Sequence, residues 1–235
     1  MNNKNIYKLI ILGDTGVGKS TVLLNYIDKT TNINPDIYPT IGLDYRRKDL
    51  KIEQDNVILN VWDTAGQEQF SSIVQLNYRN VDGAILVYDI TNRDSFEKIK
   101  TWYDGLNLYL NRDKYVIMIL GNKTDKEEER KVTTEELTNL AEELQVMYFH
   151  EISALTDHSN KIDSYLEEYV KTIHTLNKIN KKKSFSKLIC KTKPNYNKYD
   201  SDSSDDNCDD QSASYGHYNF LNNTDKRDCY NRCCL

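Results

Sequence analysis

Cysteine is absent from the first 189 residues of this 235-residue sequence. The five cysteines all come later, as Cys190, Cys208, Cys229, Cys233 and Cys234. A disulfide framework would cross-link a folded domain, and here the cysteines follow the end of the apolar periodicity. We therefore exclude a disulfide-stabilised secreted domain and expect the protein in the reducing cytosol.

Long hydrophobic runs are also missing. No stretch approaches the roughly 18 apolar residues of a membrane span, and the polar first five residues predict no signal peptide. Membrane attachment must then be covalent or electrostatic. The net charge of −5 does not favour nucleic acid, so we expect no nucleic-acid partner.

What the sequence does contain, up to about residue 179, is an alternation of short apolar runs with polar helical stretches. The predicted strands are 7–12, 43–52, 57–63, 83–90, 115–121 and 147–152. The predicted helices are 19–28, 70–78, 95–110, 134–144 and 161–178. A threonine at 133 or 134, followed by Glu135 and Glu136, indicates a capping box.

The runs 85–88 and 116–120 are continuously apolar, which is typical of strands covered on both faces of a parallel sheet. The polar residues 53–56 separate two strand-like runs and predict a hairpin with one antiparallel edge. We predict an α/β domain over 1–179, a P-loop three-layer fold with a six-stranded, mostly parallel sheet and helices on both faces. A disordered tail is expected over 180–235.

The residues 13–20, GDTGVGKS, lie between a predicted strand and a predicted helix. Such a glycine-rich turn directs backbone N–H groups and a helix N-terminus at one point, which favours a bound phosphate. Lys19 would reach the β- and γ-phosphates, and the Ser20 hydroxyl would ligate Mg²⁺.

Two further segments fit this chemistry. Asp63 ends a predicted strand and can hold Mg²⁺ through water, Gly66 offers an N–H to a γ-phosphate, and the adjacent Gln67 can orient an attacking water. In the polar loop that begins near residue 30, Thr40 could bond Mg²⁺ through its hydroxyl and the γ-phosphate through its N–H. Only a triphosphate would then order this loop.

The residues that follow the predicted strands 115–121 and 147–152 could select the base of the nucleotide. Asp125 can accept two hydrogen bonds from guanine, whereas adenine presents an acceptor that Asp125 would repel. Asn122 can connect this loop to the phosphate loop, and the Lys123 stem can cover the base. In the following Ser153-Ala154, the Ala154 N–H could meet the guanine carbonyl oxygen.

Taken together, these motifs resemble the Ras superfamily of small GTPases, and within it the Rab family, across residues 6–178. The segments that carry the Rab resemblance are IGLDY at 41–45, WDTAGQE at 62–68, LVYDIT at 86–91, Tyr78-Arg79 and the terminal Cys-Cys pair. The stretch 102–131 is most similar to the Rab-eighteen branch. The sequence departs from the family pattern at Gln69 and 71–77, so the choice of effector and activator does not carry over. It also departs at Ile33, where the family often has an aromatic against the guanine ring, and at Leu155, where many relatives have lysine over the base.

The resemblance implies a site with three groups of residues. Gln67 is the catalytic residue, and Ser20, Thr40 and Asp63 hold the metal. The nucleotide is bound by Thr15, Gly16, Val17, Gly18, Lys19, Ser20, Thr21, Pro35, Thr40, Gly66, Asn122, Lys123, Asp125, Ser153 and Ala154. The expected reaction is hydrolysis of GTP to GDP and phosphate, with Mg²⁺ as cofactor, in a switch that serves vesicle trafficking. A scaffold with negligible turnover and an ATP-using P-loop enzyme are the alternatives, opposed by Gln67 and Asp125 respectively.

The tail extends this interpretation. Seven lysines between 178 and 193 could contact an anionic membrane surface, and an acidic block over 200–210 reads as a solvated linker. Arg232 occupies the position where a Cys-a-a-X box needs cysteine, so the resemblance implies two geranylgeranyl groups on Cys233 and Cys234. The implied partners are an exchange factor, a GTPase-activating protein, an escort protein with its geranylgeranyl transferase, a GDP-dissociation inhibitor and effectors. The implied location is the cytoplasmic face of the endoplasmic reticulum, Golgi or lipid droplets, with a cytosolic pool.

Overall fold

The computed structural model describes residues 5–29, 43–64, 78–110, 115–157 and 160–191, with the backbone alone at 43, 160 and 181–191. Several predictions fall outside these residues. They are the helix at 70–77 and the site residues Pro35, Thr40, Gly66, Gln67, Cys233 and Cys234.

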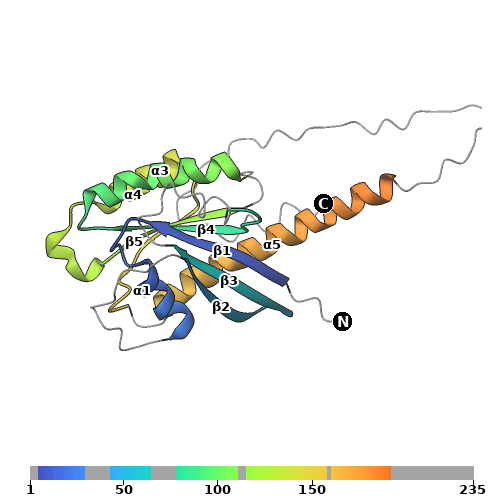
Figure 1. The fold of residues 1–235 in the computed structure, drawn as a ribbon, viewed down its shortest axis with the longest axis horizontal. Coiled ribbons are helices and arrows are strands. Elements are labelled where there is room, and N and C mark those ends of the chain that lie inside the picture. Colours follow the sequence, from blue (N-terminus) through green and yellow to red (C-terminus); the bar gives the residue numbers. More distant parts are fainter. Residues whose placement is uncertain (1–4, 30–42, 65–77, 111–114, 158–159, 192–235) are drawn as a thin grey trace, which may run out of the picture. The chain divides into compact units, whose positions relative to one another are not determined.

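Six strands form one sheet in the order β2-β3-β1-β4-β5-β6 (Figure 1). Their bounds are β1 Asn5–Gly13, β2 Leu43–Ile52, β3 Asp55–Thr64, β4 Gly83–Asp89, β5 Val116–Asn122 and β6 Tyr148–Glu151. Every neighbouring pair is parallel except β2 and β3, which are antiparallel. The predicted sheet with one antiparallel edge is therefore confirmed.

The β2–β3 hairpin is tighter than the sequence predicted. Ile52 pairs with Asp55, so only Glu53 and Gln54 lie between the strands. Glu53 has a φ of 54°, and such left-handed turn residues suit the twist of two-residue hairpins. The strand β3 accordingly begins two residues before the predicted start at 57.

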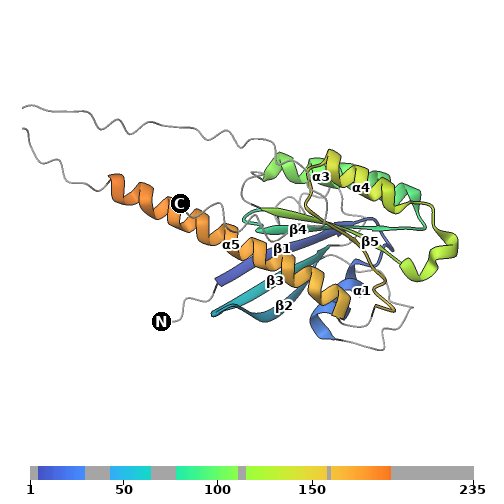
Figure 2. The ribbon, with the colours of Figure 1, turned by 180° about the vertical axis from the view of Figure 1, so that it is seen from behind.

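Helices cover both faces of the sheet, as predicted (Figures 1 and 2). Their bounds are α1 Lys19–Leu23, the π-helical turn η1 Leu24–Asp28, α3 Arg93–Tyr109, the 3₁₀ turn η3 Thr124–Glu129, α4 Thr134–Glu143 and α5 Asn160–Lys191. One buried cluster joins α1 and α5 to the sheet, and a second joins α3 and α4 to the opposite face.

The alternation along β1 divides the core between these two clusters. Leu9 and Ile11 pack in the cluster of α1 and α5, whereas Ile10 and Leu12 pack with α3 and α4. All four are at most 1% exposed. Because successive side chains of a strand point to opposite faces, a central strand covered on both sides is apolar throughout.

Caps decide where two of the helices begin. The Asn92 side chain accepts hydrogen bonds from the N–H groups of Asp94 and Ser95, so α3 starts two residues before the predicted position. Thr133 and Glu136 form the reciprocal bonds of a capping box, and α4 begins at residue 134 as predicted.

The last helix is longer than predicted. The apolar periodicity ends near 178, but α5 continues to Lys191, so residues 180–191 are not the expected coil. No glycine or proline occurs between 160 and 193, and lysine is a good helix former. No helix among the described residues is both long and apolar enough to cross a bilayer.

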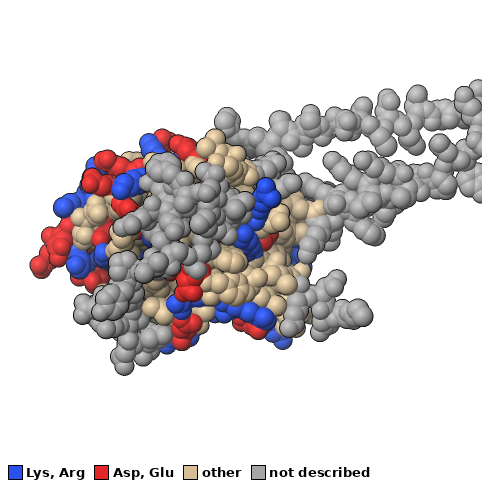
Figure 3. Space-filling view, in the orientation of Figure 1, with Lys and Arg blue, Asp and Glu red and all other residues tan. Residues whose placement is uncertain are grey.

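Surface charges of both signs are intermixed over the described residues on the face shown in Figure 3. Ion pairs also connect helices of one layer, as between Lys100 of α3 and Glu143 of α4 at 2.8 Å. Such exposed pairs each contribute little to stability.

Candidate nucleotide-binding site

The glycine-rich turn follows β1 and leads into α1. Three of its glycines have positive φ: 148° at Gly13, 76° at Gly16 and 96° at Gly18. A Cβ at Gly13 would lie 2.2 Å from the Val87 carbonyl oxygen, and one at Gly18 would lie 2.3 Å from Asn122 Nδ2. The turn therefore requires glycine at both places, for conformation and for space.

Lys19 begins α1 and turns back across this loop. Its Nζ donates to the carbonyl oxygens of Gly13 at 3.0 Å and Asp14 at 2.9 Å. Lys19 is 6% exposed, and burial lowers its pKa. A cation held in this way lies inside the turn, as an anion-binding lysine must.

Ser20 and Asp63 meet although they are 43 residues apart. Ser20 Oγ donates to Asp63 Oδ2 at 2.5 Å. Asp63 is fully buried, its Oδ1 has no hydrogen-bond partner among the described residues, and burial raises its pKa. A buried carboxylate oxygen without a donor fits a hard cation, since Mg²⁺ prefers oxygen ligands.

Asn122, at the end of β5, joins two loops. Its Nδ2 donates to the Val17 carbonyl oxygen at 2.8 Å, and its Oδ1 accepts from the Ala154 N–H at 2.9 Å. The predicted connection between this strand end and the phosphate loop is confirmed. The side chain is buried, so its bonds are made away from water.

The other residues predicted to read the base lie beside Asn122. Ser153 Oγ donates to Asp125 Oδ1 at 2.5 Å, and the Thr124 N–H donates to the Ile152 carbonyl oxygen at 3.2 Å. Lys123 has a left-handed φ of 73°, and its Nζ lies 2.6 Å from Asp89 Oδ2. The segments 122–125 and 151–154 therefore form one surface at the carboxyl ends of β5 and β6.

The bond predicted for Ala154 differs. Its N–H already donates to Asn122, so a guanine carbonyl would have to share or displace that bond. The sequence interpretation also missed Asn25 of η1, a buried amide whose Nδ2 donates to the carbonyl oxygens of Ala154 and Asp157. A polar residue inside the apolar stretch 22–27 was the signal for it.

The remaining predicted loop residues lie along the same turn. The Thr15 N–H donates to Asp14 Oδ1 at 2.9 Å, and Asp14 Oδ2 lies 2.6 Å from Nζ of Lys98 on α3. Val17 is buried, while Thr21 is half-buried on α1. The turn is thus attached to the α3 layer through a charge pair that the sequence interpretation did not include.

Comparison with known proteins agrees with this geometry. A model of the Ras family matches residues 8–175. The Ras-related protein RABC2b of Arabidopsis thaliana is 41% identical over 151 residues, or 64% of this chain and 72% of the relative. RabC of Dictyostelium discoideum is 40% identical over 156 residues, or 66% and 78% of the two chains. Rab-18-B of Danio rerio is 40% identical over 166 residues, or 71% and 78%. Each described site residue lies inside the segment that the family model matches.

Proposed function

This chain belongs to the Ras family as a Rab small GTPase, an enzyme that hydrolyses GTP, and from that premise we propose that it is a magnesium-dependent, lipid-anchored switch. Its general role, as for its Rab relatives, is in vesicle trafficking. The proposal adds the metal, the residue roles, the membrane anchor and the partners.

The observation that carries the proposal is the bond from the half-buried Ser20, on α1, to the buried Asp63, near the end of β3. Ser20, Asp63 and Thr40 would hold Mg²⁺, which supplies charge stabilisation at the phosphates when bound. No cluster of three acidic, histidine or cysteine side chains suited to a metal occurs among the described residues. This agrees with Mg²⁺, which is usually held by one or two protein groups together with substrate phosphates.

The residues of the glycine-rich turn stabilise charge during hydrolysis. Lys19 and the backbone N–H groups from 15 to 21 bind the phosphates, with Gly66 at the γ-phosphate and Gln67 aligning the attacking water. No arginine occurs between residues 25 and 40 to act on the phosphates from within the chain. The intrinsic rate is therefore slow, and an activating protein that supplies an arginine accelerates it by roughly 10³–10⁵.

The base is read by the surface at the ends of β5 and β6. Asp125 accepts from the N1–H and the exocyclic amine of guanine, Lys123 covers the ring, and Ala154 and Ser153 line the carbonyl side. Asn122 keeps this surface at a fixed distance from the phosphate loop through its bond to Val17. Pro35 belongs to the same nucleotide site by resemblance alone.

The predicted domain covers 1–179, although its last helix continues to Lys191, and the segment that follows would attach the protein to the membrane. Geranylgeranyl groups on Cys233 and Cys234 would anchor the protein stably, since one lipid chain binds only marginally and two do not detach readily. The location is then the cytoplasmic face of endomembranes, with a cytosolic pool bound to a GDP-dissociation inhibitor. Replacing both cysteines by serine should release a tagged protein from membranes, whereas Cys229→Ser should not; membrane retention of the double variant would disprove the anchor.

The proposed partners follow from the cycle between the GTP-bound and GDP-bound forms. An exchange factor loads GTP, a GTPase-activating protein ends the signal, effectors bind the GTP form, and an escort protein presents the chain to geranylgeranyl transferase.

A direct test compares Ser20→Ala with the control Ser164→Ala. Ser164 is exposed on α5 and donates only to the Lys161 carbonyl oxygen. Ser20→Ala should abolish the Mg²⁺ dependence of GDP retention and slow single-turnover GTP hydrolysis by more than tenfold, while Ser164→Ala should match the parent protein. Hydrolysis by Ser20→Ala at the parent rate, with the parent's Mg²⁺ dependence, would overturn the metal assignment.

A further inference from the structure

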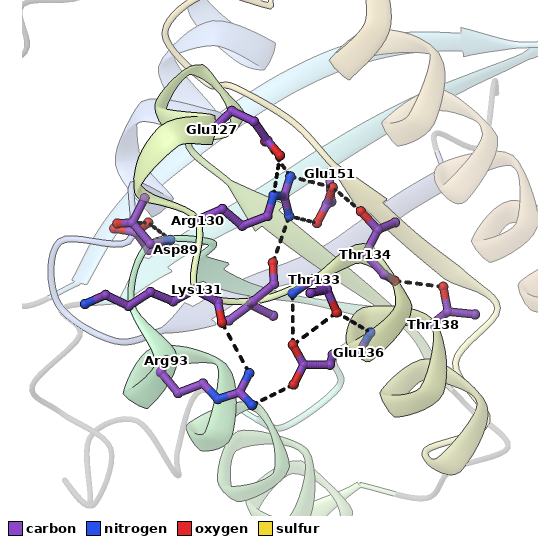
Figure 4. Close-up of polar contacts among 12 residues, drawn as sticks. Asp89, Arg93, Glu127, Arg130, Lys131, Thr133, Thr134, Glu136, Thr138 and Glu151 are labelled. Atoms are coloured by element: carbon purple, nitrogen blue, oxygen red, sulfur yellow. Dashed lines mark hydrogen bonds and ion pairs between the residues drawn. The ribbon is translucent and has the colours of Figure 1, made fainter.

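Arg130 lies directly after η3, outside every motif described so far, and Figure 4 shows its side chain reaching between two chain segments. We propose that Arg130 is a positioning residue that holds the two guanine-reading segments, 122–125 and 151–154, in register. This inference rests on the proposed guanine site and goes beyond it, because Arg130 itself does not contact the nucleotide.

The guanidinium group of Arg130 uses all of its donors. Nε and Nη2 donate to the two carboxylate oxygens of Glu127 at 2.7 and 2.8 Å. Nη1 and Nη2 donate to the two oxygens of Glu151 at 2.7 and 3.1 Å. The second N–H of Nη1 donates to the Val132 carbonyl oxygen at 2.8 Å. Two bidentate carboxylate pairs on one planar group fix their partners in orientation as well as distance.

One carboxylate lies inside a base-reading segment, and the other lies just after the second segment. Glu127 lies two residues after Asp125, and Glu151 lies two residues before Ser153. Asp125 and Ser153 are themselves bonded at 2.5 Å. Arg130 therefore joins the chain two residues away from each partner of this contact.

In this clamp of Arg130, Glu127 and Glu151, the ion pair of Arg130 with Glu151 is stronger than its pair with Glu127, because it is more buried. The side chains of Arg130 and Glu151 are 17% and 15% exposed, whereas Glu127 is 64% exposed. Glu151 Oε2 also accepts from Thr134 Oγ1 at 3.0 Å, which ties the clamp to the first residue of α4. The bonds from the two glutamates raise the pKa of Arg130, so the guanidinium is charged at every usable pH.

Removing the guanidinium would leave two carboxylates that face each other without a cation. Their repulsion, together with the loss of the only cation bonded to the half-buried Glu151 among the described residues, favours separation of the segments. The segments would stay connected by backbone bonds, such as that from the Ile152 N–H to the Gly121 carbonyl oxygen. The expected effect is therefore a displaced Asp125 and not an unfolded domain.

Asp125 is the group whose position distinguishes guanine. Inosine diphosphate has the carbonyl and N1–H of guanine but lacks the exocyclic amine, so it makes one bond fewer to Asp125. A variant that misplaces Asp125 should lose affinity for GDP more than for inosine diphosphate. A variant that only weakens the fold should lose affinity for both nucleotides by the same factor.

The experiment measures release of radiolabelled GDP and inosine diphosphate from the full chain in excess Mg²⁺. Arg130→Ala should release GDP about tenfold faster, which corresponds to about 1.4 kcal/mol, and should reduce the preference for GDP over inosine diphosphate. Arg130→Lys keeps the charge without the planar guanidinium group, so its rate of GDP release should lie between those of the parent protein and Arg130→Ala. Arg93→Ala is the matched control, since Arg93 bonds Glu136 and the Lys131 carbonyl oxygen and neither glutamate of the clamp.

Equal acceleration of both nucleotides, or release of GDP at the parent rate, would overturn the inference. If Arg130→Ala does not fold, Arg130→Lys and Glu151→Gln test the inference instead, through the ratio of the release rates of GDP and inosine diphosphate. A parent protein that retains GDP poorly and prefers no base would instead contradict the proposed function, and the two failures are thereby distinguished.

Discussion

In the glycine-rich turn, the space around a position determines which residue type can occupy it. A side chain at Gly18 would meet the amide nitrogen that Asn122 uses to bond Val17. The φ of 96° at Gly18 adds strain for any other residue. Backbone conformation thus favours glycine at all three positions of the motif, and packing adds to it at Gly13 against β4 and at Gly18 against β5.

Gly18→Ala should lower the free energy of unfolding by about 2 kcal/mol or more, from the backbone strain and the displaced Asn122. The matched substitution is Gly105→Ala inside α3, where an added Cβ meets no atom within 4 Å. It should raise stability by about 0.5–1 kcal/mol, as alanine does inside a helix. Urea unfolding of the GDP-bound proteins measures both, and equal midpoints for the two variants would contradict the argument.

The sequence predicted the residues of the site better than their bonds. Lys19, Ser20, Asp63 and Asn122 lie where the motifs indicated, because a strand end followed by a polar residue has only one edge of a parallel sheet to occupy. The bond from Ala154 to Asn122 and the clamp around Arg130 were missed. Both depend on which loops meet in three dimensions, and local spacing does not encode that.

At the scale of elements, the beginning of α4 combines a cap with an ion pair. Glu136 accepts from the Thr133 N–H and from Arg93 Nη2 of α3 (Figure 4). The bond from Arg93 first, and then the backbone bond at Thr133, lower the pKa of Glu136 to about 2. Because the folded-state pKa is lowered, this stability is complete above about pH 4.5 and is lost as the pH falls toward 2.

Glu136→Gln should therefore destabilise the protein near neutral pH, and the difference from the parent should shrink as the pH approaches 2. Glu135→Gln is the control, since the capping box is formed by Thr133 and Glu136 and does not include Glu135. Thermal unfolding midpoints at pH 7, 4 and 3 give the comparison. A deficit for Glu136→Gln that stays constant with pH would show that the lowered pKa contributes nothing.

Element boundaries show where sequence reasoning succeeds. The strands β4 and β5 were predicted within one residue at each end, since continuous apolar runs must be buried on both faces. The helix ends were less accurate, because Asn92 begins α3 early and α5 continues into a lysine-rich stretch. Caps and intrinsic propensity set those ends, whereas apolar periodicity only reports burial.

At the scale of the whole chain, the sheet separates two functions. Its carboxyl edge bears the glycine-rich turn, the Ser20–Asp63 pair and the surface proposed to read the base, while α5 precedes in the sequence the residues that include Cys233 and Cys234. The central claim is that GTP with Mg²⁺ binds at that edge and orders the segments 30–42 and 65–77, which contain Thr40, Gly66 and Gln67. Loss of the γ-phosphate would then release both segments.

Hydrogen exchange tests this claim most directly, on the protein loaded with GDP or with a non-hydrolysable GTP analogue, in Mg²⁺. The account predicts slower exchange of 30–42 and 65–77 in the analogue-bound form, with β1, β4 and β5 equally protected in both. Indistinguishable exchange of these two segments in the two loaded forms would contradict it.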